Sequence, residues 1–142
     1  ADTCADAYQI SDGAGGRFLI EGNLGGTTNN YTALDNTAPG CSAANSTLGG
    51  ADQVLSFTVP SGQTGEVFLD LDDNASVDVD VALTGDPCNS LNMGLVGCNV
   101  VLSDTYTGLA PGTYYLVVFE DSATYQSSQD EPYRYEIELT FQ

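Results

Sequence analysis

Aspartates alternate with small or apolar residues through one short segment near the middle of the chain, from Asp70 to Asp80 (DLDDNASVDVD). If the flanking strands form a hairpin, keeping valines and leucines on the buried face sets Asp72 opposite Asp78 and Asp70 opposite Asp80. Opposed carboxylates raise one another's pKa unless a cation lies among them. Several hard oxygen donors suit Ca²⁺. The predicted Ca²⁺ ligands are Asp70, Asp72, Asp73, Asp78 and Asp80.

A solvated acidic surface is the alternative interpretation of this segment. The chain has 20 Asp and Glu residues against 2 Lys and Arg, which gives a formal net charge of −18 over its 142 residues. Clusters of aspartate are expected at that composition without any bound ion, and the spacing is not that of an EF-hand. Both interpretations stay open at this point.

The composition also excludes several kinds of chemistry. The chain contains no His, so neither a Ser-His-Asp nor a Cys-His nucleophile system is available. It contains no Lys, so it can form no Schiff base. A polyanion repels nucleic acid and anionic lipid, so we expect neither as a partner. No apolar run is long enough for a membrane span. We therefore expect a protein that is not an enzyme.

Four cysteines in a chain of this length predict disulfides. We expect the pairs Cys4–Cys41 and Cys88–Cys98; the other two connectivities stay open, and a four-thiolate metal site is disfavoured because no C-x2-C spacing occurs. Disulfides indicate an oxidising compartment, and the start at Ala1 fits a secreted protein whose leader has been removed. The sequons at Asn30, Asn45 and Asn74 permit glycosylation.

Short alternating segments separated by turn residues predict an all-β fold. Half-buried alternation favours antiparallel sheets, and about seven or eight such strands indicate a β-sandwich. We expect a single domain over residues 1–142, with a loop-rich part at 1–50 held by a disulfide and a core at 51–142. The expected strands are 17–21, 54–59, 66–72, 77–83, 99–102, 113–119 and 133–141.

Three motifs in the second part resemble the bacterial pre-peptidase C-terminal domain. The segment from Ala51 to Gly62 (ADQVLSFTVPSG) is similar to its opening strand, Asp78 to Leu83 (DVDVAL) to its D-x-D-x-x-L strand, and Leu109 to Val118 (LAPGTYYLVV) to its L-x-x-G-x-Y-x-V-x-V strand. The resemblance implies a jelly-roll-like sandwich related to the collagen-binding modules of collagenases. It also implies that Asp78 and Asp80 are ion ligands.

Two functions are consistent with these observations. The first is a non-catalytic extracellular module, stabilised by Ca²⁺ and disulfides, that binds a polymer such as a polysaccharide or a matrix protein. The second is a structural subunit that assembles with copies of itself into an extracellular filament or surface layer. Both predict a secreted protein, and the cell surface is one location that fits.

Overall fold

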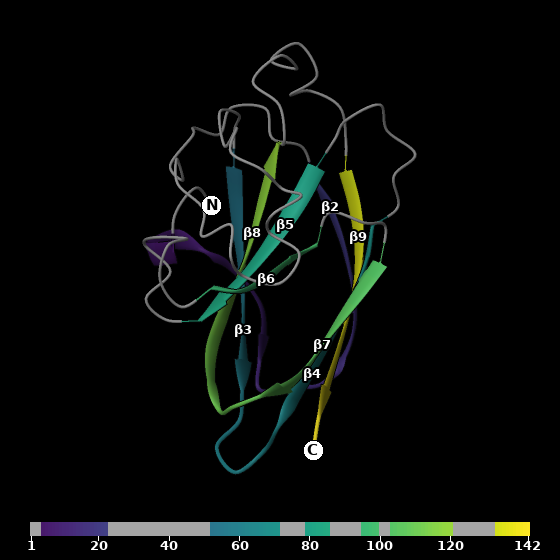
Figure 1. The fold of residues 1–142 in the computed structure, drawn as a ribbon. Helices are drawn as coiled ribbons and strands as arrows, with labels where there is room; N and C mark the ends of the chain where they lie inside the picture. The colour runs from purple at the N-terminus through teal and green to yellow at the C-terminus, as the bar shows by residue number, and fades with distance from the viewer. Residues whose placement is uncertain (1–3, 23–51, 72–78, 86–94, 100–102, 121–132) are drawn as a thin grey trace.

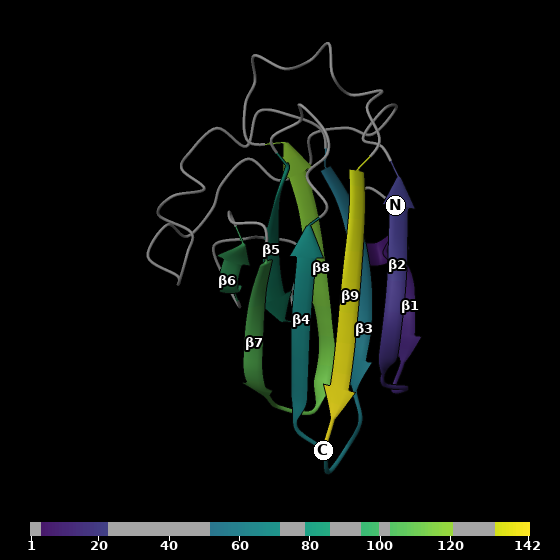
Figure 2. The same cartoon turned by 90° about the vertical axis from the view of Figure 1, so that its right-hand side faces the viewer.

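The computed structural model describes residues 4–22, 52–71, 79–85, 95–99, 103–120 and 133–142. These residues form two packed β-sheets (Figures 1 and 2). One short 3-10 helix, Cys4–Asp6, precedes the first strand. None of the helical structure in these ranges has the length and apolar character needed to cross a membrane.

The described residues form nine strands, which make up the two sheets. They are β1 (Tyr8–Asp12), β2 (Gly16–Gly22), β3 (Asp52–Val59), β4 (Gly65–Leu71), β5 (Val79–Gly85), β6 (Leu95–Asn99), β7 (Ser103–Leu109), β8 (Gly112–Glu120) and β9 (Tyr133–Phe141).

The strand order is that of a jelly roll with one extra strand. The five-stranded sheet has the order β1-β3-β8-β5-β6, and the four-stranded sheet has the order β2-β9-β4-β7. Without β1, the order of each sheet matches one half of a jelly roll, in which successive strands mostly change sheet. The expected all-β, jelly-roll-like sandwich is confirmed.

The expectation of purely antiparallel pairing is wrong at one edge, because β1 runs parallel to β3. Both strands lead into the four-stranded sheet at the same end of the sandwich (Figure 2). Two neighbouring strands that leave a sheet at the same end must point in the same direction. The other pairs are antiparallel.

Apolar residues at alternate positions fill the space between the sheets. Val67 and Leu69 of β4 and Ile137 and Leu139 of β9 are buried, as their alternation with charged residues predicts. The core cluster comprises Leu55, Phe57, Val59, Val67, Leu69, Val81, Leu83, Leu109, Leu116, Val118, Ile137 and Leu139. Burying these side chains supplies the main stabilisation of the fold.

The turn between β3 and β4 is formed by residues that favour it. The amide of Gln63 donates to the carbonyl of Pro60 at 3.1 Å, and Gly62, the third residue of the turn, has φ of 80°. A positive φ at this position is typical of a type II turn and favours glycine. The expected end of the strand at 54–59 is therefore confirmed.

The hairpin expected between residues 66–72 and 77–83 is wrong. β4 lies in the four-stranded sheet, between β9 and β7, whereas β5 lies in the five-stranded sheet, between β8 and β6. Both strands turn apolar side chains toward the same core, but from opposite sides of it. Alternation alone fixes which face of a strand is buried and does not fix which strand lies beside it.

Other differences concern polar or irregular strands. β1 and β7 were not expected, because YQISD and SDTYTGL show little apolar alternation. β6 spans Leu95–Asn99, whereas the expected strand was 99–102. All three are edge strands. Their exposure to solvent weakens the alternation of apolar and polar residues.

Candidate binding surface

The outer side of the four-stranded sheet presents a continuous face of polar and partly exposed apolar side chains, which we call the open face. One row across it consists of Arg17, Glu138, Phe68 and Thr105, in register on β2, β9, β4 and β7. The next row consists of Leu19, Glu136, Asp70 and Ser103. Glu66 and Thr140 are paired in a third row.

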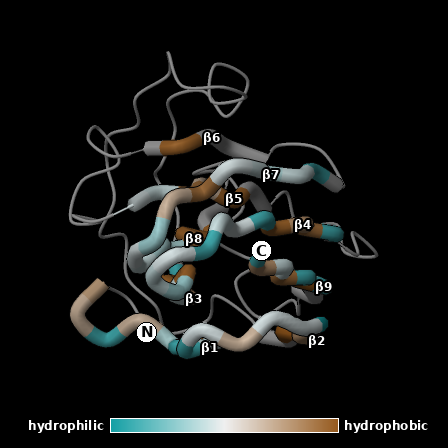
Figure 3. The backbone as a smooth tube through the Cα atoms, turned by 90° about the horizontal axis from the view of Figure 1, so that it is seen from below, coloured by the Kyte–Doolittle hydropathy of each residue, from teal (hydrophilic) through white to brown (hydrophobic). Residues whose placement is uncertain are grey.

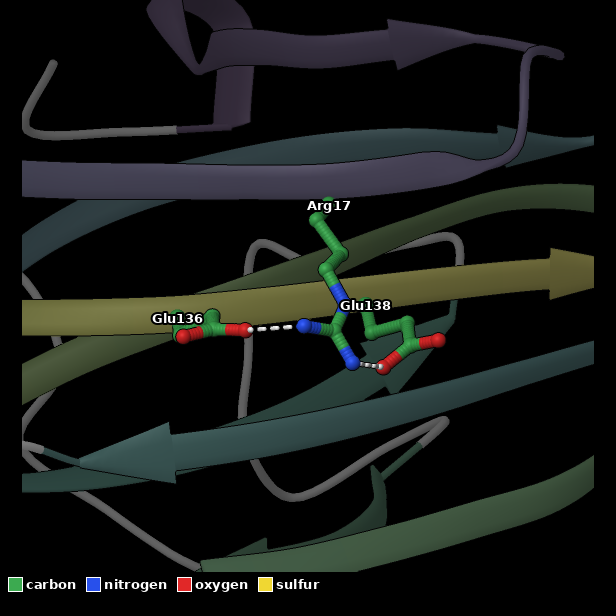
Figure 4. Close-up of polar contacts among 3 residues, drawn as sticks. All are labelled: Arg17, Glu136 and Glu138. Atoms are coloured by element: carbon green, nitrogen blue, oxygen red, sulfur yellow. Dashed lines mark ion pairs between the residues drawn. The ribbon is translucent and has the colours of Figure 1, made fainter.

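Carboxylates dominate the open face, and among its described side chains Arg17 is the one cation. The guanidinium of Arg17 is 3.5 Å from an oxygen of Glu136 and 3.3 Å from an oxygen of Glu138 (Figure 4). The Arg17 side chain is 70% exposed, so these ion pairs are screened by water and contribute little to stability. Asp70 lies directly opposite Glu136, which leaves like charges side by side on the sheet.

A small hollow of about 170 Å³ continues the open face at the end of β9. It is lined by Thr64, Gly65, Glu66, Gly108, Thr140 and Gln142. Thr64 and Gln142 exchange two backbone hydrogen bonds there, at 2.6 and 2.9 Å. The hollow therefore has a fixed backbone wall and polar side chains that can donate or accept hydrogen bonds.

The predicted Ca²⁺ ligands are divided between the two sheets or lie outside the described residues. Asp70 is exposed on β4, while Asp80 belongs to β5 and pairs in register with Phe119 of β8. The expected opposition of Asp70 and Asp80 is thus wrong. Asp72, Asp73 and Asp78 are outside the described residues, and among the described residues no group of three potential metal ligands lies together. Calcium binding stays a prediction.

Of the four cysteine side chains and the three sequon asparagines, the structure describes only the side chain of Cys4. Cys4 is disulfide-bonded. Cys41 and Cys88 lie outside the described residues, and only the backbone of Cys98 is described. The pairing of the four cysteines therefore stays a prediction. Asn30, Asn45 and Asn74 are outside the described residues as well.

The open face was not identified from the sequence, although one signal for it was present. The chain has only two Arg residues. One of them, Arg134, alternates with Glu136 and Glu138 along β9, and the other, Arg17, lies on β2, the strand that pairs with β9. The grouping of Arg17 with Glu136 and Glu138 could be recognised only from the pairing of β2 with β9, and these two strands are more than a hundred residues apart in the sequence.

Tyr106 is a second residue whose environment only the structure reveals. It lies on β7 opposite Val67 and packs against the core. Burial raises the pKa of the Tyr106 phenol above its ordinary value, and the negative charge of Asp104 raises it further. Its hydroxyl oxygen is buried, and among the described residues no group is well placed for a hydrogen bond to it, although Asp104 is near enough to act on its pKa. Tyr114 differs, because its hydroxyl donates to the carbonyl of Ala110 at 3.0 Å.

These features define a jelly-roll β-sandwich whose four-stranded sheet carries an open acidic face. The chain is similar in structure to a periplasmic inhibitor of g-type lysozyme from Aeromonas hydrophila, with a TM-score of 0.50 and 10% identity over 96% of this chain and 99% of that one. It is also similar to the pre-peptidase C-terminal domain of collagenase from Bacillus anthracis, with a TM-score of 0.49 and 13% identity over 95% of both chains.

The comparisons therefore concern the fold. The pre-peptidase C-terminal domain, which the strand motifs resemble, is among the structures to which the chain is similar. No protein-family model and no curated protein sequence matches the chain. At identities of 10 to 13% a shared sandwich does not carry a ligand with it.

Proposed function

We propose that this chain is a non-catalytic extracellular module that binds an extended polymer, a polysaccharide or a matrix protein, along the open face of its four-stranded sheet. The observation that carries the proposal is the open face itself. It combines a row of side chains in register across four strands (Arg17, Glu138, Phe68 and Thr105) with the hollow at the end of β9. An open sheet face fits an extended ligand better than it fits a small molecule, which needs a concave pocket.

The charge of the face favours a particular kind of polymer. Glu66, Asp70, Glu136 and Glu138 are offset only by Arg17 among the described side chains of the open face. Carboxylates accept hydrogen bonds from sugar hydroxyls and attract basic side chains, but they repel sulfated or uronic polymers. We therefore propose a neutral polysaccharide or a basic matrix protein as the ligand.

The test measures retention of the chain on immobilised polymers. The probes are a neutral glucan, fibrillar collagen and an anionic glycosaminoglycan. We expect retention on one of the first two and none on the third. Replacing Phe68 by Ala and, separately, Glu138 by Gln is expected to weaken binding roughly tenfold. Asp12→Asn is the matched control, because Asp12 is exposed on β1 of the other sheet.

Two outcomes would overturn the proposal. The first is absence of retention on every neutral and basic polymer. The second is binding that is weakened by Asp12→Asn as much as by the open-face variants, because the ligand would then contact another surface. Calcium and disulfides belong to the proposal as stabilising features, and the calcium part has its own test below.

A further inference from the structure

The exposed large apolar side chains of the described residues gather at one side of the sandwich. They are Tyr8, which is 60% exposed, and Leu19, which is 52% exposed. Tyr8 belongs to β1 and Leu19 to β2, the edge strands of the two sheets at the same side of the molecule (Figure 3). Two single exposed apolar side chains are common on a protein surface and do not by themselves mark an interface, so the edge strand itself must show whether a partner binds there.

β2 is the most regular of the four edge strands. It pairs with β9 over all seven residues without a shift of register. The pairings of β1, β6 and β7 each contain such a shift. No described strand pairs with the outer side of β2, and its sequence contains neither Pro nor Lys. Its two charged residues, Arg17 and Glu21, are opposite in sign, so they oppose pairing with an unrelated strand but not with a strand of complementary charge.

The sequence of β2 is self-complementary about its central residue. The strand reads Gly16-Arg17-Phe18-Leu19-Ile20-Glu21-Gly22. An antiparallel pairing of two copies centred on Leu19 sets Arg17 of each copy opposite Glu21 of the other. The same register sets Phe18 opposite Ile20 and Leu19 opposite Leu19. Opposite charges and paired apolar side chains at facing positions stabilise antiparallel strands.

We propose that the chain forms a two-fold dimer in which β2 of one copy pairs antiparallel with β2 of a second copy. The pairing joins the two four-stranded sheets into one continuous sheet and satisfies both free edges at once. The interface is isologous, so the assembly closes at two copies and leaves no β2 edge for further addition. The proposal goes beyond polymer binding and does not depend on it.

The position of β2 is fixed by its connection to β1. The hydroxyl of Ser11 donates to the carbonyl of Ala14 at 2.5 Å and accepts from the amide of Ala14 at 3.0 Å. Phe18 and Ile20 are partly buried and pack against the core. The edge is thus held in place before a second copy arrives, which lowers the entropic cost of association.

Charge complementarity favours a second copy over an unrelated partner. The chain carries a net charge of −18 and only two Arg residues, so two copies repel except where an Arg faces a carboxylate. The Leu19-centred register provides two such facing pairs, and a register shifted by two residues would lose them. Arg17 is 70% exposed, and its guanidinium lies over β9 beside Glu136 and Glu138 (Figure 4), so it must turn toward the outer side of β2 to meet Glu21 of a second copy.

The test is sedimentation equilibrium of the full chain from micromolar to millimolar concentration in EDTA, at an ionic strength of about 0.15 M, where the Debye length is about 8 Å. We expect a reversible monomer–dimer equilibrium. Arg17→Glu and Glu21→Arg are each expected to raise the dissociation constant at least roughly tenfold. An equimolar mixture of the two variants is expected to dimerise again, because both facing pairs then become opposite in charge.

A second pair of variants keeps the proposal testable if Arg17→Glu fails to fold. Leu19→Lys adds a charge to the proposed interface, and Thr105→Lys adds the same charge on β7, the opposite edge of the same sheet. Dimer loss is expected only for Leu19→Lys. The proposal is overturned by a wild-type chain that stays monomeric, by a dimer that survives Leu19→Lys, or by a mixture of the two charge variants that stays monomeric although each is folded.

Discussion

Gly65, the first residue of β4, packs so closely on Val59, the last residue of β3, that a Cβ atom added to Gly65 would lie 2.6 Å from Cγ2 of Val59. The same atom would lie 3.4 Å from Cβ of Leu109. The absence of a side chain at residue 65 therefore lets the chain cross from one sheet to the other without opening the core.

Gly65→Ala is expected to lower the free energy of unfolding by about 1–3 kcal/mol, because Val59 is buried and cannot move aside freely. Chemical denaturation measures the change. In a Val59→Ala background the added methyl group has room, so the same substitution is expected to cost much less. Equal costs in both backgrounds would show that the contact with Val59 is not the cause.

Leu69→Ala tests the core at the centre of β4. Leu69 is 1% exposed and lies opposite Ile137 of β9. We expect a loss of about 2–5 kcal/mol in unfolding free energy from the lost burial and the cavity left behind. Leu19→Ala is the matched control, and because Leu19 is 52% exposed the expected change is within about 0.5 kcal/mol at a protein concentration too low for the proposed dimer to form. Similar losses for the two variants would contradict the assignment of the core.

Tyr106 is expected to make stability sensitive to alkaline pH. Its pKa is raised in the folded chain by burial and then by Asp104, so the unfolded chain releases the phenolic proton first as the pH passes about 10. The contribution is fully present below that pH, and it is lost as the pH rises toward the folded-state pKa. Denaturation at a series of alkaline pH values measures the slope.

Tyr106→Phe is expected to flatten that slope, because the group that titrates differently in the two states is removed. Tyr114→Phe is the control. It removes a hydrogen bond to Ala110, which costs about 0.5–1.5 kcal/mol, and so separates the loss of a phenolic hydroxyl from the loss of Tyr106 itself. If the unfolding free energy of Tyr106→Phe falls as steeply with alkaline pH as that of the wild-type chain, other groups cause the pH dependence.

Calcium is expected to raise the melting temperature and EDTA to lower it, because an ion bound only by the folded chain stabilises it by about 2.7 kcal/mol at a hundredfold excess over its Kd. Ligand oxygens lie about 2.3–2.6 Å from Ca²⁺, and packed sheets are about 10 Å apart. Asp80 lies on the five-stranded sheet and Asp70 on the open face of the other.

One ion therefore cannot bind both residues, and because the strand motif resembling the pre-peptidase C-terminal domain implies Asp80 as a ligand, we expect Asp80→Asn to abolish the calcium effect on melting and Asp70→Asn to leave it intact. Scanning calorimetry with Ca²⁺ and with EDTA distinguishes the two variants. A melting temperature that is the same in both solutions would assign the aspartates to a solvated acidic surface. That was the alternative which the composition left open.

Local features of the fold could be predicted from the sequence. Alternation along β4 and β9 correctly assigned Val67, Leu69, Ile137 and Leu139 to the core, because successive side chains of a strand point to opposite faces. Pro60-Ser61-Gly62 marked the turn after β3 for an equally local reason, since a positive φ favours glycine. The strand motifs also led to the jelly-roll architecture.

The neighbours of each strand were decided only by the tertiary structure. Asp70 and Asp80 alternate with apolar residues in the same way, yet β4 and β5 lie in different sheets. β2 and β9, at opposite ends of the chain, lie side by side and bring Arg17 to Glu136 and Glu138. A period of two fixes the buried side of a strand, whereas its partners depend on how the connections cross between the sheets. Sites built across strands, such as the open face, therefore emerge only when the whole sandwich is assembled.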